Sequence, residues 1–177
     1  MENALSILLA NAENFEELYA FYIRMNEVIN SRNSGFNPNN PVFPEEDTVK
    51  DAIKNGGQII ATFNGKIVAA AIVNGRGEPA YNRVKWNIPA AENEFWVLHA
   101  LRVAPEYEGR GIARQMLAFI TELAQKRGIK SIRLDVLEGY SVAQLYLNFG
   151  FKYVDTVEML YADIGYTRRF DLLEKQI

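Results

Sequence analysis

The chain contains no cysteine and one histidine, His99, among its 177 residues. Without cysteine it can form neither a disulfide nor a thiolate metal site, and it cannot use a cysteine nucleophile. A single histidine also excludes a histidine-rich metal centre, so we expect no metal.

Charge of one sign and long apolar runs are also scarce. The formal net charge is −3, from 19 basic and 22 acidic side chains, which is too weak and too evenly spread to predict a nucleic-acid partner or an anionic membrane surface. The longest aliphatic run, Ile67 to Val73, is far shorter than the roughly 20 residues of a membrane span. The first residues lack the basic flank of a signal peptide. We expect a cytoplasmic protein without a membrane partner.

The composition that remains is that of an ordinary globular domain. Hydrophobic residues make up 49% of the chain and charged residues 23%, which argues against disorder. A chain of 177 residues is long enough to bury a sizeable core in one domain. The sequence shows neither an internal repeat nor a second domain. We therefore predict a single domain over residues 1–177.

The pattern of apolar residues predicts an alternation of strands and helices. Strands are expected at residues 5–9, 58–63, 66–73, 95–103, 131–137, 152–160 and 166–172. Helices are expected at residues 15–30, 45–55, 113–127 and 141–149. Asn14 is the predicted N-cap of the first helix, with Glu17 at the reciprocal position, and Asn64-Gly65 predicts a two-residue hairpin turn. In the last helix, Val142, Leu145, Tyr146 and Phe149 are expected to be buried. The order predicts an α/β fold with a parallel crossover at its centre.

The segment "PEYEGRGIARQML", Pro105 to Leu117, joins the central strand to a helix and carries two glycines, Gly109 and Gly111. A helix N-terminus exposes unpaired N–H groups and a partial positive charge, and glycines before it allow close approach. The amides of residues 109–113 can therefore hold a phosphate or pyrophosphate. A tight turn without any ligand explains the same glycines equally well.

Two familiar phosphate-binding patterns fit this turn poorly. The P-loop pattern G-x-x-x-x-G-K-[ST] does not occur in the chain. The dinucleotide pattern requires a small residue where Arg114 stands. Asp135, however, follows the glycines at a sequence spacing that suits a ribose contact. That pattern also follows the first strand of its unit, whereas here about a hundred residues precede it. A dinucleotide-binding oxidoreductase is therefore a weak alternative.

The same segment resembles motif A of the GNAT superfamily, the acetyl-CoA-dependent N-acetyltransferases, whose signature is Q/R-x-x-G-x-G/A. Here it reads E-G-R-G-I-A over residues 108–113, with Glu108 in place of Gln or Arg. "LYLNFGF", Leu145 to Phe151, resembles the L-Y-x-x-x-G-F of motif B, although Gly139 stands where that motif usually has Asn. The resemblance extends over essentially the whole chain.

The resemblance implies a GNAT fold, with a mixed and mostly antiparallel sheet of about seven strands, a splayed central parallel pair and flanking helices. It implies acetyl-CoA as cosubstrate, with the pantetheine arm along the splayed strand and the pyrophosphate on the glycine turn. The implied cofactor-binding residues are Leu101, Arg102, Val103, Glu108, Gly109, Arg110, Gly111, Ile112, Ala113, Ser141 and Tyr146. The implied reaction is direct attack of a primary amine, from a small molecule or a peptide, without an acyl-enzyme.

This reaction needs one base and one acid, because the amine must lose a proton and the leaving thiolate gains from a proton donor. The resemblance implies Tyr146 as the acid, although its place on an apolar helix stripe also fits a core residue. His99 is the first candidate base, since arylalkylamine acetyltransferases carry a catalytic histidine at the equivalent place and alternation puts it on one face with Leu101. A core histidine fits as well, and Glu94 and Glu92 are the alternative bases.

For the acceptor amine, the resemblance places the pocket between the loop after the first helix and the later strands. Tyr22, Phe36, Phe43 and Trp86 are the candidate walls, and each could equally be a core residue. Nothing in the sequence identifies the amine. A non-catalytic acyl-CoA-binding sensor or partner module is the main alternative function, and a homodimer is left open.

Overall fold

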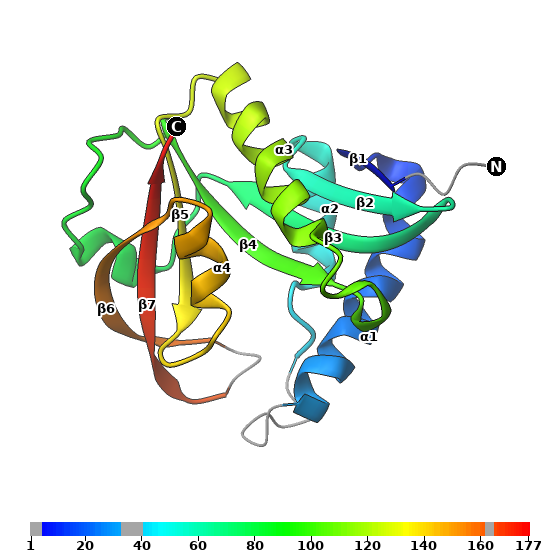
Figure 1. Ribbon diagram of the computed structural model, residues 1–177. Coiled ribbons are helices and arrows are strands. Elements are labelled where there is room, and N and C mark those ends of the chain that lie inside the picture. The colour runs from blue at the N-terminus through cyan, green and yellow to red at the C-terminus, as the bar shows by residue number, and fades with distance from the viewer. Residues whose placement is uncertain (1–4, 33–40, 162–164) are drawn as a thin grey trace. The chain divides into compact units, whose positions relative to one another are not determined.

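The structure, a computed structural model, describes residues 5–32, 41–161 and 165–177. Its strands are β1 (Leu5–Leu9), β2 (Gln58–Phe63), β3 (Lys66–Asn74), β4 (Phe95–Val103), β5 (Ser131–Leu137), β6 (Lys152–Leu160) and β7 (Thr167–Gln176). The α-helices of the described residues are α1 (Phe15–Arg32), α2 (Glu46–Lys54), α3 (Ile112–Lys126) and α4 (Ala143–Asn148) (Figure 1). The predicted α/β class with about seven strands is confirmed.

The seven strands form one mixed sheet in the order β1-β2-β3-β4-β5-β7-β6. By contacts the chain divides into two compact units, residues 1–73, 99–116 and 162–165 in the first and residues 74–98, 117–161 and 166–177 in the second. Strand β4 and helix α3 each contribute residues to both units. The expectation of a single domain over the whole chain stays a prediction.

Strands β1, β2 and β3 of the first unit are antiparallel, with Leu5 opposite Phe63 and Gln58 opposite Ile72. The hairpin between β2 and β3 has positive φ at both of its central residues, 51° at Asn64 and 76° at Gly65. A type I′ turn requires this backbone geometry, and Asn-Gly adopts it readily. The predicted hairpin is confirmed.

Helices α1 and α2 of this unit lie on one face of these strands (Figure 1), and a shared apolar core joins them. Its buried members include Leu18, Phe21, Tyr22, Met25, Val49, Ala52, Ile60, Ala70 and Ile72. The apolar residues of α1 recur at helical spacing, so one side of the helix faces this core. In helices of this length, packing of the apolar face usually contributes more stability than intrinsic helix propensity does.

The predicted N-cap of the first helix is wrong. Asn11 is the cap: its side chain accepts the Glu13 N–H at 2.9 Å, while the Asn14 side chain accepts the Asn11 N–H at 2.9 Å. A single 3-10 turn therefore precedes α1, since two Asn residues three apart can complete a reciprocal box. Glu17, the predicted partner, instead accepts the backbone N–H of Ile67 at 2.9 Å.

In the second unit β5, β7 and β6 lie side by side and antiparallel, and β4 pairs in parallel with β5 from Phe95 to Val97. The predicted parallel pair at the centre of the sheet is confirmed. Strand β7 runs to Gln176 rather than ending at Leu172, and it pairs with β5 along its length. The last residues of β7 are polar, so the apolar pattern of the sequence did not predict this extension.

Helix α4 is shorter than predicted, and its burial differs from the expected pattern. Tyr146 is the buried residue of α4, whereas Val142, expected to be buried, is 45% exposed. Leu145 and Phe149 are only half-buried. The reason is that the helix begins at Ala143 and has six residues, so Val142 lies at its cap and not on its inner face.

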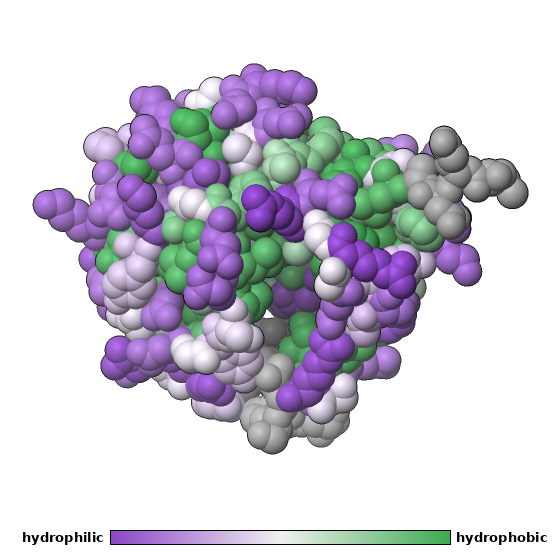
Figure 2. Space-filling view, in the orientation of Figure 1, coloured by the Kyte–Doolittle hydropathy of each residue, from purple (hydrophilic) through white to green (hydrophobic). Residues whose placement is uncertain are grey.

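Polar side chains cover much of the molecular face in Figure 2, with smaller apolar areas between them. Within the described part of the chain, no helix has the length and apolarity to cross a membrane.

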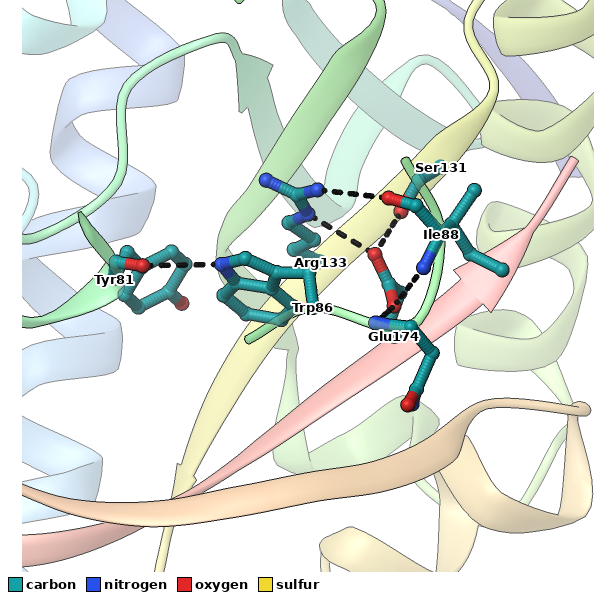
Figure 3. Close-up of polar contacts among 7 residues, drawn as sticks. Tyr81, Trp86, Ile88, Ser131, Arg133 and Glu174 are labelled. Carbon is teal, nitrogen blue, oxygen red and sulfur yellow. Dashed lines mark hydrogen bonds and ion pairs between the residues drawn. The ribbon is translucent and has the colours of Figure 1, made fainter. Parts of the chain in front are cut away.

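A buried ion pair stabilises the second unit (Figure 3). Arg133 Nε lies 3.1 Å from Glu174 Oε1, and both side chains are almost fully shielded from solvent. Glu174 also accepts the Ser131 hydroxyl at 2.8 Å and the N–H groups of Asn87 and Ile88 at 2.8 and 3.1 Å. The Arg133 guanidinium lies over the ring of Phe95 at 4.1 Å. The ion pair and its hydrogen bonds thus connect Asn87 and Ile88, which precede β4, to strands β5 and β7.

We expect Glu174→Gln to destabilise the fold by about 3–5 kcal/mol, because removing one member of a buried pair leaves the other charge uncompensated. Glu138→Gln is the control, since Glu138 pairs with Arg169 at the surface and exposed pairs contribute about 0–1 kcal/mol. Urea unfolding measures both variants. Equal midpoints for the two would contradict the assigned role of Glu174.

Candidate functional site

The turn between β4 and α3 is built on two glycines in the left-handed region. Gly109 has φ +73° and Gly111 has φ +75°, and a Cβ added at either position would meet no atom within 4 Å. Residues with a side chain pay roughly 1–2 kcal/mol in this region. Space beside the backbone is open here, so backbone geometry and ligand access explain the glycines, and tight packing does not.

Helix α3 begins directly behind this turn, and the Gln115 N–H donates to the Gly111 carbonyl at 3.1 Å. The N–H groups of Ile112, Ala113 and Arg114 therefore precede the first i→i−4 bond of the helix. The helix is anchored because Ile112 and Met116 are buried. The turn and the N-terminus of this fifteen-residue helix thus offer amides and a dipole that could hold an anion, and we call residues 109–113 the cradle.

The two acidic residues before the cradle face helix α1. Glu106 Oε1 accepts a hydrogen bond from Arg24 Nη1 at 2.9 Å, and Glu108 Oε1 accepts one from Arg32 Nη1 at 2.7 Å. The bond from Arg24 lowers the pKa of Glu106, and the bond to Glu108 raises the pKa of Arg32. Glu108, which replaces the Gln or Arg of the motif, is therefore held by a partner within the protein.

A guanidinium lies beside the cradle on an aromatic support. The Arg110 guanidinium is 5.0 Å from the ring centre of Tyr107, and that ring packs on Phe63 at 5.5 Å. Stacking of this kind restricts the guanidinium and leaves its donors available at the surface. Sequence analysis assigned Arg110 to the cradle for its amide alone.

The second half of β4 departs from regular strand geometry at Ala100, which has φ +49°. The predicted alternation is therefore interrupted between His99 and Leu101, and a shared face no longer follows from their spacing. Leu101, Arg102 and Val103 are all half-buried. The Leu101 carbonyl accepts a hydrogen bond from the Arg102 side chain at 3.2 Å.

The candidate acid and bases lie on different elements. His99 is half-buried in the first unit. Tyr146 is buried in the second unit, with its ring edge-on to Phe151 at 5.7 Å. Ser141 and Glu92, also in the second unit, are exposed. That these residues and the cradle form one active site stays a prediction.

Glu94 has a structural partner. It accepts the Ala91 N–H at 3.0 Å and lies 2.7 Å from Lys130 Nζ. The Ala91 bond, followed by the Lys130 bond, lowers the pKa of Glu94. A carboxylate with a lowered pKa is a weaker base, which makes Glu94 a poorer candidate than His99.

The candidate walls of the acceptor pocket have structural roles where they are described. Tyr22 is fully buried in the core of the first unit, its hydroxyl accepts a bond from Gln58 at 3.1 Å, and burial raises its pKa. It does not face open solvent. The Phe43 backbone is held at both its N–H and its carbonyl by the Asn26 side chain. Phe36 lies outside the described residues.

Trp86 also has a structural role, in the second unit. Its indole N–H donates to the Tyr81 carbonyl at 3.1 Å, and its ring packs on Arg133 at 4.4 Å (Figure 3). These contacts hold the Trp86 side chain against the buried Arg133–Glu174 ion pair. Neither its position nor that of Phe43 tests a contact with a substrate.

Sequence reasoning missed the acidic group around Asp135. Asp135 Oδ2 accepts hydroxyl bonds from Tyr81 at 2.7 Å and Tyr161 at 2.8 Å. Burial, and then the charge of Asp135, raises the pKa of Glu78. The aspartate that a dinucleotide site would offer to a ribose is thus already bonded to tyrosines. Only the spacing of Asp135 from the glycines had drawn attention to it.

Comparison with known proteins identifies the family of the chain. The sequence model of the Acetyltransferase (GNAT) family matches residues 17–151, which is more than half of the chain. The chain belongs to the GNAT acetyltransferase family. No curated protein matches it by sequence.

Solved GNAT structures share the fold at low identity. The ribosomal-protein-S18-alanine N-acetyltransferase from Escherichia coli has a TM-score of 0.67 and 19% identity, over 98% of this chain and 94% of that one. The polyamine N-acetyltransferase of Drosophila melanogaster has a TM-score of 0.71 and 14% identity, over 98% and 100%. The N-acetylglutamate synthase from Neisseria gonorrhoeae, complexed with coenzyme A and N-acetyl-glutamate, has 0.66 and 16%, over 99% and 36%. These identities establish the fold alone.

The family uses acetyl-CoA, and the cradle is compatible with its phosphates, because both glycines leave the approach to the amides open. In the described ranges, no group of three or more His, Cys, Asp or Glu residues is placed to hold a metal ion.

Proposed function

We propose that this GNAT protein is an N-acetyltransferase that transfers the acetyl group of acetyl-CoA to a primary amine of a small molecule or peptide. The observation that carries the proposal is the open amide cradle at residues 109–113 in a chain of this family. A phosphate on these amides is stabilised by several N–H donors and by the helix dipole.

The cofactor is held by the first unit in this proposal. The amides of residues 109–113 bind the pyrophosphate, and the backbone of Leu101 and Val103 pairs with the pantetheine arm. Acetyl-CoA supplies the thioester carbonyl that the amine attacks. Ser141 and Tyr146 are further cofactor-binding residues that the family resemblance implies.

His99 takes the proton of the incoming ammonium group, directly or through water, so that the nitrogen lone pair is free to attack. A new C–N bond forms as the C–S bond breaks, the nitrogen releases its second proton to solvent, and the Tyr146 hydroxyl donates its proton to the departing sulfur. His99 suits the first step because an imidazole titrates near neutral pH. The acid and the base can then exchange protons with solvent and return to their starting states.

The acceptor class is drawn from the amines named for the structural neighbours. Those proteins are named for agmatine, for polyamines and for the alanine of a ribosomal protein, all of which offer a primary amine. We propose the same group as the nucleophile here, on a small molecule or on a peptide.

The function is tested by incubating the protein with acetyl-CoA and a panel of amines that includes agmatine, spermidine and peptides with free N-termini, while free CoA is measured. Release of CoA that depends on the amine supports the proposed acetyltransferase activity. Tight CoA binding without release for any amine supports a non-catalytic acyl-CoA-binding module. Absence of CoA binding would refute both.

We expect Gly111→Glu to abolish CoA binding, because a side chain and a negative charge would occupy the place of the pyrophosphate. Gly128→Glu is a matched control: Gly128 has φ +71° and open space around it, like Gly111, but lies behind the other end of α3. Both changes carry the same backbone strain, about 1–2 kcal/mol. Calorimetry on the folded proteins measures binding, and unchanged CoA affinity in Gly111→Glu would show that the cradle is misassigned.

Tyr146→Phe should lower kcat with little change in the KM for acetyl-CoA, because the ring packing on Phe151 is kept and only the hydroxyl is lost. General acids contribute about 10²–10⁴-fold, and a weakly basic thiolate places the effect near the lower value. Tyr153→Phe, an exposed position in β6, is the control. Wild-type turnover in Tyr146→Phe would return this residue to a packing role.

His99→Gln should remove the acidic limb of the kcat/KM profile, because protonation of His99 at low pH blocks the base. Glu94→Gln should leave the limb in place, since the pKa of Glu94 is lowered and its titration lies below the range of an imidazole. Steady-state rates across pH measure both variants. The opposite result, a limb lost only in Glu94→Gln, would identify the carboxylate as the base.

A further inference from the structure

The acidic residues before the cradle pose an electrostatic problem for a polyanionic ligand. Residues 105–114 carry two carboxylates, Glu106 and Glu108, and two guanidiniums, Arg110 and Arg114. Their formal charges cancel, so this stretch offers no net attraction to phosphate. Glu108 is also the residue next to Gly109, about 3.8 Å away between Cα atoms. A free carboxylate there would oppose the amides.

Helix α1 supplies the missing positive charge. Arg24 and Arg32 lie eight residues apart in the sequence, which places them about 80° apart around a helix, so both can reach the same side of α1. Each binds one of the two carboxylates, at 2.9 Å for Glu106 and 2.7 Å for Glu108. With these two guanidiniums the local sum rises from zero to +2.

Stability does not explain these pairs. All four side chains are about half exposed, and exposed ion pairs contribute little to folding. Local charge decays over about 10 Å at moderate salt, so a pair adjacent to the cradle acts on a ligand bound there far more than on the fold. The family motif has Gln or Arg where Glu108 stands, which makes this carboxylate the unusual feature that needs compensation.

We propose that Arg32 is a positioning residue that neutralises Glu108 and thereby allows the cradle to bind the phosphates of CoA. Arg32 acts through Glu108 and not as a direct phosphate ligand. Arg24 does the same for Glu106, with a smaller effect because Glu106 is farther along the chain from the glycines. The proposal rests on the proposed function, since it requires CoA at the cradle.

A double-mutant cycle tests this proposal, with CoA affinity measured by calorimetry on the full chain. Arg32→Gln should weaken CoA binding about tenfold at low salt, which is the scale of one charge contact near a protein surface. Glu108→Gln, which restores the side chain of the motif, should bind CoA at least as tightly as the wild type. The double variant should bind CoA about as tightly as the wild type, because removing both members of a neutral pair leaves the local charge unchanged. The loss caused by removing Arg32 should be smaller with Gln at position 108, where no carboxylate is left uncompensated beside the cradle.

Two further readouts separate electrostatics from folding. At about 0.5 M salt, where exposed charges are largely screened, the CoA affinity of Arg32→Gln should approach that of the wild type. The melting temperature of the variant should equal that of the wild type. Lys50→Gln is the matched control, since it also removes one positive charge from an exposed pair, Lys50–Glu46 on α2. Its CoA affinity should equal that of the wild type.

The outcomes discriminate clearly. If Arg32→Gln weakens binding equally with Glu108 and with Gln at position 108, Arg32 is a direct ligand and the proposal is wrong. If the wild type binds CoA and Arg32→Gln binds it equally well, only this inference fails. A wild type that does not bind CoA refutes the proposed function itself.

Discussion

The turn between β4 and α3 depends on one backbone constraint, the left-handed conformation at Gly109 and Gly111. This conformation lets the chain leave β4 and enter α3 through a turn at which a Cβ on either glycine would meet no atom within 4 Å. Any residue with a side chain would be strained there and would fill part of that space. Helix α3 anchors the turn through buried side chains, and in the proposed function it also contributes its dipole to the phosphate site.

Ion pairs of the same chemistry have different consequences in the two units. Arg133 and Glu174 are buried, so each is expensive without the other, and their additional hydrogen bonds hold residues 87–88 against the sheet. Arg32 and Glu108 are exposed, so the pair adds little stability; its proposed role is to neutralise the carboxylate beside the cradle. Burial thus decides how much an ion pair matters for folding.

Several residues predicted as pocket walls or as the base have structural partners. Tyr22 is in the core, and Trp86 covers the buried arginine. Glu94 holds a short turn and a lysine, which lowers its pKa and reduces its strength as a base. Among the candidate bases this leaves His99 as the residue whose ordinary pKa suits proton transfer from an amine near neutral pH.

The sequence by itself determined the order and type of the elements and the position of the cradle, because these depend on local signals. Apolar periodicity located all seven strands, Asn64-Gly65 predicted its hairpin, and Gly109 and Gly111 marked the turn before α3. The tertiary structure decided which charges meet. Glu108 and Arg32 are 76 residues apart, and Arg133 and Glu174 are 41 apart, so no local pattern could pair them. It also decided the burial of Tyr22 and the exposure of Val142, since burial depends on what the rest of the chain packs against each side chain, and the strand break at Ala100, since the surrounding fold must hold a non-glycine residue in that conformation.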